Sequence, residues 1–401
     1  MEMMLQFGFG MMEHTRVLLR AWGGGTVILS PRDLEPEQVW RFARDVELVP
    51  GGRAIFDPQF YLPNADHERL TSHAYWPANY QSGAFWQGRE LEDLLTALGA
   101  LNTRIGAAAV ILPGPLAATV DDDWLGIQTQ ILSVARRLLP GRSLYASVAL
   151  GADAVRSQSQ VEELLEASDT WDVDGFYLVA EHPQGDYLVE DPNWLAGLLD
   201  VTAHQRLSHR VVLCGYSTHQ MLMLAAAGAS AVASGTWMNV RSFPPGKFDA
   251  AREEEIRQRA TWYYCPEALS EYKLPYLDIA QRAGILPRMR ADAGLGSNYA
   301  DTVFAGGQPS ASGFDEPAAF RHYLQCLRSQ AVSARAPTYD ATRDLLRAQL
   351  DTAENLLMQL RAAGVLGQMR DFADSIDANR SALALLDSTR GPVLRRNWPT
   401  L

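Results

Sequence analysis

The chain has 401 residues, with 35 Lys and Arg against 47 Asp and Glu, so its formal net charge is −12. This balance excludes a generally basic nucleic-acid coat and a polybasic membrane binder. Hydrophobic residues make up 47% and charged residues 20%, which indicates a globular protein that can bury a large core and excludes a mostly disordered chain.

Eight short apolar runs alternate with longer segments of helical periodicity over the first two thirds of the chain. The predicted strands are 26–30, 54–59, 107–113, 144–150, 175–181, 211–217, 231–236 and 261–265. Near-continuous apolar strands separated by helices indicate parallel pairing. Eight such units predict an α/β fold, a closed (β/α)8 TIM barrel over residues 1–290. An open doubly wound sheet is the alternative, but no GxGxxG follows the first predicted strand.

The character of the sequence changes after the predicted barrel. Residues 291–315 are rich in Gly, Ala and Ser, which predicts a long loop that crosses the barrel or closes over a site. Residues 316–401 carry apolar side chains at helical spacing, for example at Leu346, Leu350 and Leu357. We therefore predict a helical C-terminal extension that packs on the flank of the barrel.

Cysteine spacing and the N-terminal segment bear on the compartment. Cys214, Cys265 and Cys326 are far apart and form no CxxC pair, which argues against a disulfide scaffold and a self-contained zinc knuckle. The first residues lack the basic region and cleavage site of a secretory signal, and no run of about 18 apolar residues occurs. We expect a cytoplasmic protein that does not enter the membrane.

In a barrel of this kind the reactive groups lie at the carboxyl ends of the strands. Asp57 directly follows an apolar strand and is the sharpest candidate for a catalytic carboxylate; the alternative is a turn Asp before Pro58. Glu181, with a loop ion pair as its alternative role, is the second catalytic candidate. Substrate contacts are expected from Gln59, Phe60, His182, Tyr216, Ser234 and Trp237.

Three cations fall near predicted strand ends and are candidate phosphate contacts: Arg32, Arg241 and Lys247. Their alternative role is ordinary surface charge. A crowd of rings between residues 60 and 86 either lines a base-stacking groove or packs a long loop onto the barrel; its members are Phe60, Tyr61, Tyr75, Trp76, Tyr80, Phe85 and Trp86. The sequence contains no HExxH, EF-hand or P-loop motif, so we predict no metal and no cofactor.

From about residue 54 to 330 the order of features resembles the tRNA-guanine transglycosylase-like barrels. Residues 56–60 occupy the place of that family's Asp-Ser-Gly-Gly-Phe-Gln motif. The later matching segments are 174–181, 211–216, 227–229, 231–236, 262–266, 272–290 and 320–325. The resemblance implies base exchange on nucleic acid, including the insertion of 7-deazaguanine bases into DNA. Asp57 would assist the departure or return of the base, and Glu181 would face the base.

The chain departs from this family at three places. The family's nucleophilic Asp belongs at the end of the seventh strand, where this chain has Ser234 and no carboxylate before Asp249. The zinc ligands are reduced to Cys265, so structural zinc is not expected. The predicted strands 107–113 and 144–150 end without the polar groups that read guanine in the family.

Three hypotheses for the function follow. The first is a transglycosylase-like enzyme that acts on guanine or 7-deazaguanine in DNA or tRNA, with Asp57 as acid, base or nucleophile. The second is a catalytically diverged subunit of a base-modification or defence system, which binds nucleic acid, a partner protein or a second copy of itself. The third is an unrelated barrel enzyme that uses Asp57 and Glu181 as a carboxylate pair on a small carbohydrate or acid.

Overall fold

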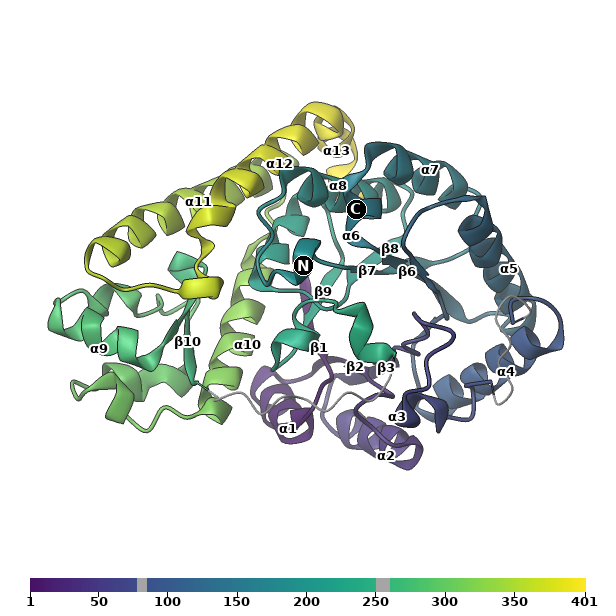
Figure 1. Cartoon of the computed structure of the whole chain (residues 1–401), viewed down its shortest axis with the longest axis horizontal. Helices are drawn as coiled ribbons and strands as arrows, with labels where there is room; N and C mark the ends of the chain where they lie inside the picture. Colours follow the sequence, from purple (N-terminus) through teal and green to yellow (C-terminus); the bar gives the residue numbers. More distant parts are fainter. Residues whose placement is uncertain (78–84, 250–259) are drawn as a thin grey trace.

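The computed structural model describes residues 1–77, 85–249 and 260–401, and its central feature is a curled parallel sheet (Figure 1). Eight strands follow one another around it: β1 (Glu2–Gln6), β2 (Gly25–Leu29), β3 (Gly52–Phe56), β4 (Ala109–Ile111), β6 (Ser143–Leu150), β7 (Gly175–Ala180), β8 (Val211–Cys214) and β9 (Ala231–Ser234). The ladder runs β3-β2-β1-β9-β8-β7-β6-β4, and the short β5 (Leu116–Ala117) also pairs with β6. The ladder is therefore open only between β3 and β4 along this path, and the predicted TIM-barrel fold class is confirmed.

One barrel strand was missing from the predicted set, and one predicted strand was wrong. The first barrel strand is β1, which pairs in parallel with β2 and β9 and was not predicted. Its sequence, EMMLQ, contains no β-branched residue, so local propensity gives no strand signal. The predicted eighth strand is β10 (Trp262–Cys265), which pairs antiparallel with β11 (Ser270–Lys273) in a separate sheet. The remaining predicted strands all belong to the barrel. Each lies one place later in the order of barrel strands than predicted, because β1 precedes them.

Helices cover the outer face of the sheet between successive strands. They are α1 (Met11–Trp22), α2 (Pro36–Glu47), α3 (Glu68–Thr71), α4 (Arg89–Arg104), α5 (Asp122–Leu138), α6 (Ala152–Arg156), α7 (Gln158–Ser168), α8 (Pro192–Leu207) and the 3-10 helix η2 (His219–Ala227). Their starts follow from the sequence: the Asp121 carboxylate accepts the Trp124 amide at the start of α5, and Asp191 caps α8, which begins with Pro192.

The chain leaves the barrel after β9 and returns to it at α10 (Glu316–Ser333). Between them lie η3 (Met238–Val240), η4 (Pro245–Phe248), β10, η5 (Pro266–Ala268), β11, α9 (Leu274–Arg282), η6 (Leu286–Met289), η7 (Asn298–Phe304) and η8 (Pro309–Ala311). Helix α10 contacts β10 on one side and β1 and α1 on the other (Figure 1). It therefore covers the barrel where the last strand, β9, meets the first, β1. The domain boundaries that we expect near residues 290 and 315 stay predictions.

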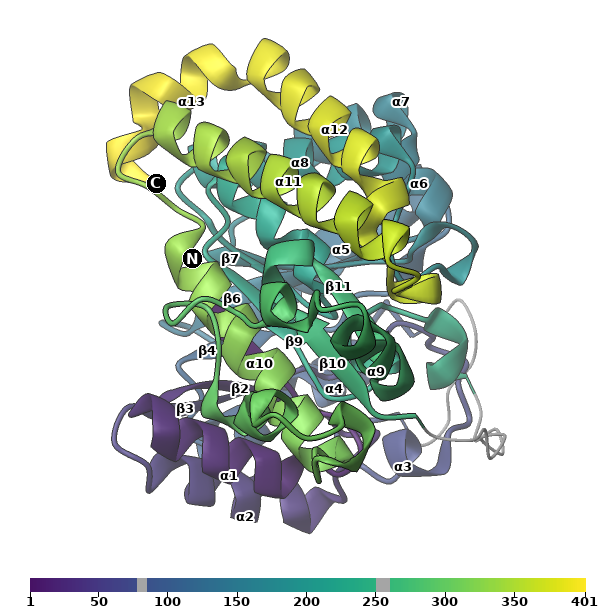
Figure 2. The ribbon, with the colours of Figure 1, turned by 90° about the vertical axis from the view of Figure 1, so that its left-hand side faces the viewer.

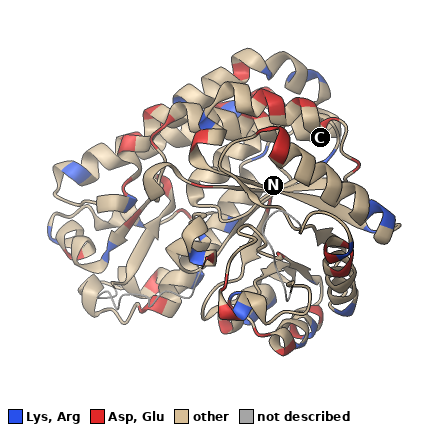
Figure 3. Ribbon diagram, turned by 45° about the vertical axis from the view of Figure 1, so that its right-hand side comes forward, with Lys and Arg blue, Asp and Glu red and all other residues tan. Residues whose placement is uncertain are grey.

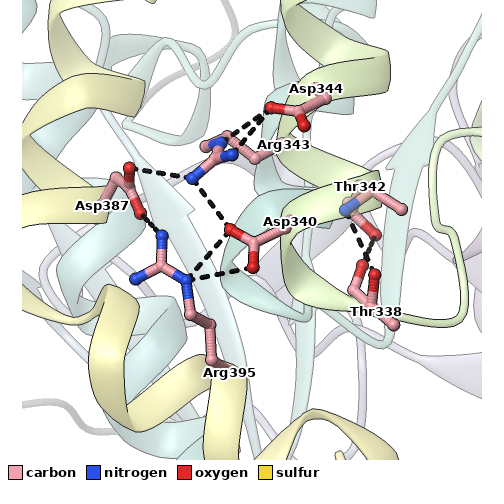
Figure 4. Close-up of polar contacts among 8 residues, drawn as sticks. Thr338, Asp340, Thr342, Arg343, Asp344, Asp387 and Arg395 are labelled. Carbon is pink, nitrogen blue, oxygen red and sulfur yellow. Dashed lines mark hydrogen bonds and ion pairs between the residues drawn. The ribbon is translucent and has the colours of Figure 1, made fainter.

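The remaining residues form α11 (Tyr339–Ala362), η9 (Gln368–Arg370), η10 (Phe372–Ser375), α12 (Ile376–Thr389), α13 (Gly391–Asn397) and η11 (Trp398–Thr400). Helices α11 and α12 run side by side, and α12 packs on α8 of the barrel (Figure 2). Asp387 of α12 binds Arg343 of α11 at 3.0 Å and Arg395 of α13 at 2.6 Å (Figure 4). This ion network joins the three helices of the C-terminal extension.

Within the part of the chain that the structure describes, none of the helices combines the length and apolarity that a membrane crossing requires.

Candidate functional site

Asp57 lies at the carboxyl end of β3, where its side chain is completely buried. Its Oδ1 accepts the backbone amide of Gln59 at 2.9 Å, and its Oδ2 accepts the hydroxyl of Tyr61 at 2.8 Å. The hydroxyls of Tyr177 and Tyr216 each lie 3.0 Å from Oδ2. Three tyrosine hydroxyls from separate parts of the barrel thus converge on one carboxylate, and we name these four residues the Asp57 cluster: Asp57, Tyr61, Tyr177 and Tyr216.

The electrostatics of the Asp57 cluster keep protons on the hydroxyls. Burial raises the pKa of Asp57, and the hydrogen bonds from Gln59 and the tyrosines oppose that rise. Burial and the neighbouring Asp57 charge raise the pKa of all three tyrosines well above the usual value. The tyrosines are therefore donors at neutral pH, and the carboxyl group is poised to exchange a proton closer to neutrality than an exposed Asp.

Amide side chains form a second layer around the cluster. Gln59 Nε2 donates to Ser30 Oγ at 2.8 Å and to Tyr216 Oη at 2.9 Å. Gln6, at the end of β1, places its Oε1 3.2 Å from Tyr177 Oη. Gln59 and Tyr216 both have a φ of 51°, in the left-handed region that non-glycine residues rarely adopt. Such strained backbone conformations concentrate at functional sites, because the surrounding structure must hold them.

The segment 237–249, which follows β9, covers the Asp57 cluster. The ring of Phe243 lies 4.9 Å from that of Tyr61, and the ring of Phe248 lies 5.0 Å from it. Lys247 Nζ sits 4.5 Å from the centre of the Tyr216 ring, and its carbonyl accepts Arg32 Nε at 3.0 Å. The half-buried Lys247 thus lies against the cluster, with the half-buried Arg32 beside it, and their role as phosphate contacts stays a prediction.

Arg241 has a different environment from the one predicted for a phosphate contact. Its side chain is 2% exposed, and its Nη1 pairs with Glu271 Oε2 at 3.1 Å. Arg370 Nη1 binds the same oxygen at 2.7 Å, and Tyr187 donates to Glu271 Oε1 at 2.8 Å. The structure gives Arg241 an internal carboxylate in place of the predicted phosphate, because Glu271 and Arg370 come from distant parts of the chain.

Ser234 is the last residue of β9, and Trp237 follows it in the segment that leaves the strand. Ser234 is completely buried at the end of the strand. The Trp237 indole donates to the carbonyl of Phe9 at 3.1 Å, and its ring packs edge-on against Phe320 of α10 at 4.9 Å. Trp237 therefore packs at the junction of the barrel with α10.

Glu181 and His182 line a separate cavity of about 1150 Å³ beside the end of β7. Its walls carry seven carboxylates and one guanidinium: Asp153, Glu181, Asp186, Glu190, Asp191, Asp371, Asp374 and Arg156. Asp57 is not among its lining residues, so the predicted catalytic pair does not share this space. The negative charge of these walls disfavours the binding of a nucleic-acid phosphate backbone.

Outside this cavity, acidic and basic residues are interspersed along the outer helices in the view of Figure 3.

The predicted aromatic crowd packs a loop. Phe60 is completely buried, with its ring 4.9 Å from that of Phe85 and 4.6 Å from that of Trp76. Trp86 packs edge-on against Phe85 at 4.7 Å. Tyr80 lies outside the described residues. Apart from Tyr61 and Tyr75, which donate to Asp57 and to the Pro58 carbonyl, the described rings contact one another, as loop packing requires.

The sequence analysis named Asp57, Gln59 and Tyr216 as site candidates and placed Tyr61 in the aromatic crowd. It did not name Tyr177 or Gln6. Tyr177 lies inside a fully buried strand, where a hydroxyl needs a partner. A tyrosine hydroxyl within an otherwise apolar strand was the sequence feature that could have identified Tyr177.

Across the described residues, no group of three or more His, Cys, Asp or Glu could hold a metal ion, and Cys214, Cys265 and Cys326 are free and buried.

Gly215 provides a test of the geometry of Tyr177. A Cβ atom at this position would lie 2.5 Å from Tyr177 Oη and 2.7 Å from its ring. Gly215→Ala is therefore expected to push the hydroxyl away from Asp57 and to lower the free energy of unfolding by about 1–3 kcal/mol. Urea titration measures this loss, and Gly246→Ala, where the new Cβ meets no atom within 4 Å, is the matched control. Equal stability of the two variants would contradict the observed packing.

Buried histidines make stability depend on pH. Burial lowers the pKa of His182 from 6.5 to about 4. The unfolded chain therefore binds the proton first, and stability that is present above pH 6.5 is lost as the pH falls toward 4. The shift corresponds to about 3 kcal/mol. We expect His182→Gln to flatten the fall in unfolding free energy between pH 7 and pH 5; parallel pH profiles for the variant and the unaltered chain would refute this.

Comparisons with known proteins show no family for the chain. No protein-family profile and no curated protein matches it. Among solved structures it resembles a GH10 xylanase of Thermobacillus composti, with a TM-score of 0.38, 10% identity, and coverage of 61% of this chain and 88% of that one. A 3-dehydroquinate dehydratase from Aquifex aeolicus has a TM-score of 0.36, 10% identity and coverage of 62% and 95%. A glucosidase from Croceicoccus marinus has a TM-score of 0.35, 9% identity and coverage of 59% and 60%. Structural similarity this weak carries no information about any reaction that the chain catalyses.

Proposed function

We propose that this chain is a transglycosylase-like enzyme that exchanges a guanine or 7-deazaguanine base in tRNA or DNA, with Asp57 as the reacting carboxylate. One observation carries the proposal. A single buried carboxylate at the carboxyl end of the barrel is held by three tyrosine hydroxyls, two residues away from a side-chain amide. Barrel enzymes place their reactive groups at this end.

The chemistry that this site can supply is proton transfer at a glycosidic bond. A carboxyl group whose pKa is raised by burial can donate a proton to a leaving base and take one back from an incoming base. The Gln59 amide donates both of its Nε2 protons, to Ser30 and to Tyr216, so the edge of a base would bond it by replacing one of these contacts. Arg32 and Lys247 would contact the phosphates on either side. Ser234 stands where the similar family carries its nucleophile, so the proposal rests on Asp57.

A second candidate is favoured by a specific observation. A carboxylate has about four acceptor positions, and Asp57 already receives one amide and three hydroxyls. An arrangement that is complete without substrate fits a catalytically diverged subunit that binds nucleic acid, a partner protein or a second copy of the chain. The carboxylate-pair hypothesis has less support, since Asp57 does not line the cavity of Glu181.

Exchange of labelled guanine or 7-deazaguanine into tRNA and DNA tests the proposal, with Asp57→Asn and Glu181→Gln measured beside the unaltered chain. We expect exchange that depends on Asp57. Unchanged exchange in both variants would overturn the assignment. Salt-dependent gel-shift titration identifies the second candidate, which predicts nucleic-acid binding with a steep salt dependence and no exchange. A subunit that binds only a protein partner would show neither nucleic-acid binding nor base exchange.

A further inference from the structure

A serine and a histidine meet in the part of the chain that lies outside the barrel. Ser297, just before η7, places its Oγ 2.7 Å from Nδ1 of His322 on α10. The other ring nitrogen, Nε2, lies 2.8 Å from the backbone carbonyl of Tyr264 in β10. A carbonyl only accepts hydrogen bonds, so Nε2 carries the proton and Nδ1 is left as an acceptor. The Ser297 hydroxyl therefore donates to His322.

The imidazole of His322 is fixed and neutral. Its side chain is 1% exposed, and its ring stacks on Tyr263 with centroids 4.9 Å apart and an interplanar angle of 15°. Phe314 packs edge-on against the same ring at 6.2 Å. Burial lowers the pKa of His322 to about 4. At neutral pH this imidazole can accept a proton from a neighbouring hydroxyl.

Ser297 and His322 open onto a pocket of about 350 Å³. Tyr263 and Phe304 give it aromatic walls, and Arg290 and Asn298 give it hydrogen-bond donors. This volume is at the small end of the range for ligand sites. The lining residues are separate from those that surround Asp57 and from those of the acidic cavity.

We propose that Ser297 and His322 are the nucleophile and the general base of a second catalytic site, which hydrolyses small carboxylic esters. The arrangement has the three members that an activated serine requires: a nucleophile, a base within hydrogen-bond reach, and a group that orients the base. Here the Tyr264 carbonyl orients the imidazole. Asn298 and Arg290 are the donors on the pocket wall that an oxyanion would use, and Arg290 Nη2 lies 3.5 Å from Oδ1 of Asp301 on the same wall.

The reaction balances with water as the second substrate. Ser297 Oγ forms a bond to the ester carbonyl carbon while His322 Nδ1 takes the hydroxyl proton. The bond from that carbon to the alcohol oxygen then breaks, and the alcohol leaves with the proton from Nδ1. Water attacks the acyl-serine after losing a proton to Nδ1, which returns it to Ser297 Oγ as the carboxylic acid departs.

Two measurements on the full chain test this site. p-Nitrophenyl acetate reports hydrolysis, and a fluorophosphonate probe followed by peptide mass spectrometry identifies the reactive serine. Ser297→Ala is expected to lower hydrolysis by about 100-fold and to abolish labelling at this peptide. Ser312→Ala, in the neighbouring segment, is expected to keep both signals.

The pH dependence keeps the test valid even if substitution of His322 prevents folding. Labelling of Ser297 should be constant from pH 8 to about 5.5 and fall as the pH approaches 4, where the buried imidazole becomes protonated. Labelling of Ser297 no faster than in the urea-unfolded chain would overturn the proposal. So would hydrolysis that survives Ser297→Ala unchanged.

Discussion

Glu271→Gln is expected to lower the free energy of unfolding by about 3–5 kcal/mol, because it leaves the buried Arg241 and the partly buried Arg370 without this counter-charge. Glu271 Oε2 lies 3.1 Å from Arg241 Nη1 and 2.7 Å from Arg370 Nη1. Burial alone would raise the pKa of Glu271, but the two arginines hold it at about 2. Urea titration at pH 7 measures the loss.

The sign of the pH dependence follows from the lowered pKa of Glu271. A carboxylate held at about 2 in the folded chain contributes stability that is complete above its unfolded pKa, near 4.5, and is lost as the pH falls toward 2. Glu271→Gln removes this contribution. The stability difference between the unaltered chain and the variant should therefore shrink below pH 4.5.

An exposed carboxylate with a similar partner provides the control. Glu354 Oε2 lies 2.6 Å from Arg380, but its side chain is 44% exposed. Glu354→Gln should lose far less stability than Glu271→Gln, because solvent screens the exposed pair. If the two variants lost similar amounts of unfolding free energy, the burial of Glu271 would not strengthen its ion pairs, and the prediction would be wrong.

Asp57→Asn is expected to lower the rate of base exchange by at least about 100-fold, the usual contribution of a positioned acid or base. The substitution also replaces an acceptor oxygen by a donor group: an amide NH2 in the place of Oδ2 would face the hydroxyls of Tyr177 and Tyr216, which lie 3.0 Å from Oδ2. We therefore expect a stability loss of about 1–3 kcal/mol as well. Initial rates with labelled guanine, normalised to folded protein, separate the two effects.

Asp249 is the comparison that makes this prediction specific. It is the first carboxylate after β9, is exposed, and its backbone carbonyl accepts the Asp66 amide at 3.0 Å. If the chain kept its nucleophile on the segment after β9, Asp249→Asn would abolish exchange and Asp57→Asn would not. We predict the opposite order of effects.

The fold was predictable where strands are apolar and β-branched. Val211–Cys214 and Ala231–Ser234 have this character, and both are barrel strands. Strand β1 lacks it, and its place is set by the partners on either side, β2 and β9. Trp262–Cys265 has strand propensity too, but propensity does not reveal the partner, and the hairpin with β11 removes it from the barrel.

The site was predictable only in its local part. Asp57 and Gln59 stand out because polar residues follow an apolar strand. Tyr177 reaches Asp57 across 120 positions of sequence, and Arg370 reaches Glu271 across 99. Contacts at that separation depend on the curvature of the barrel sheet and on the packing of the C-terminal extension. The residues adjacent in sequence therefore led to the prediction that Arg241 contacts phosphate or solvent, although its partners lie inside the protein.

A crystal structure of the chain grown with guanine or 7-deazaguanine tests the role of the Asp57 cluster most directly. We predict a base within hydrogen-bond distance of Asp57 and Gln59, with the segment 237–249 moved away from Tyr61 and Tyr216 to admit it. A base bound beside Glu181 and His182, with that segment unmoved and Asp57 still enclosed by its three tyrosines, would contradict the proposal.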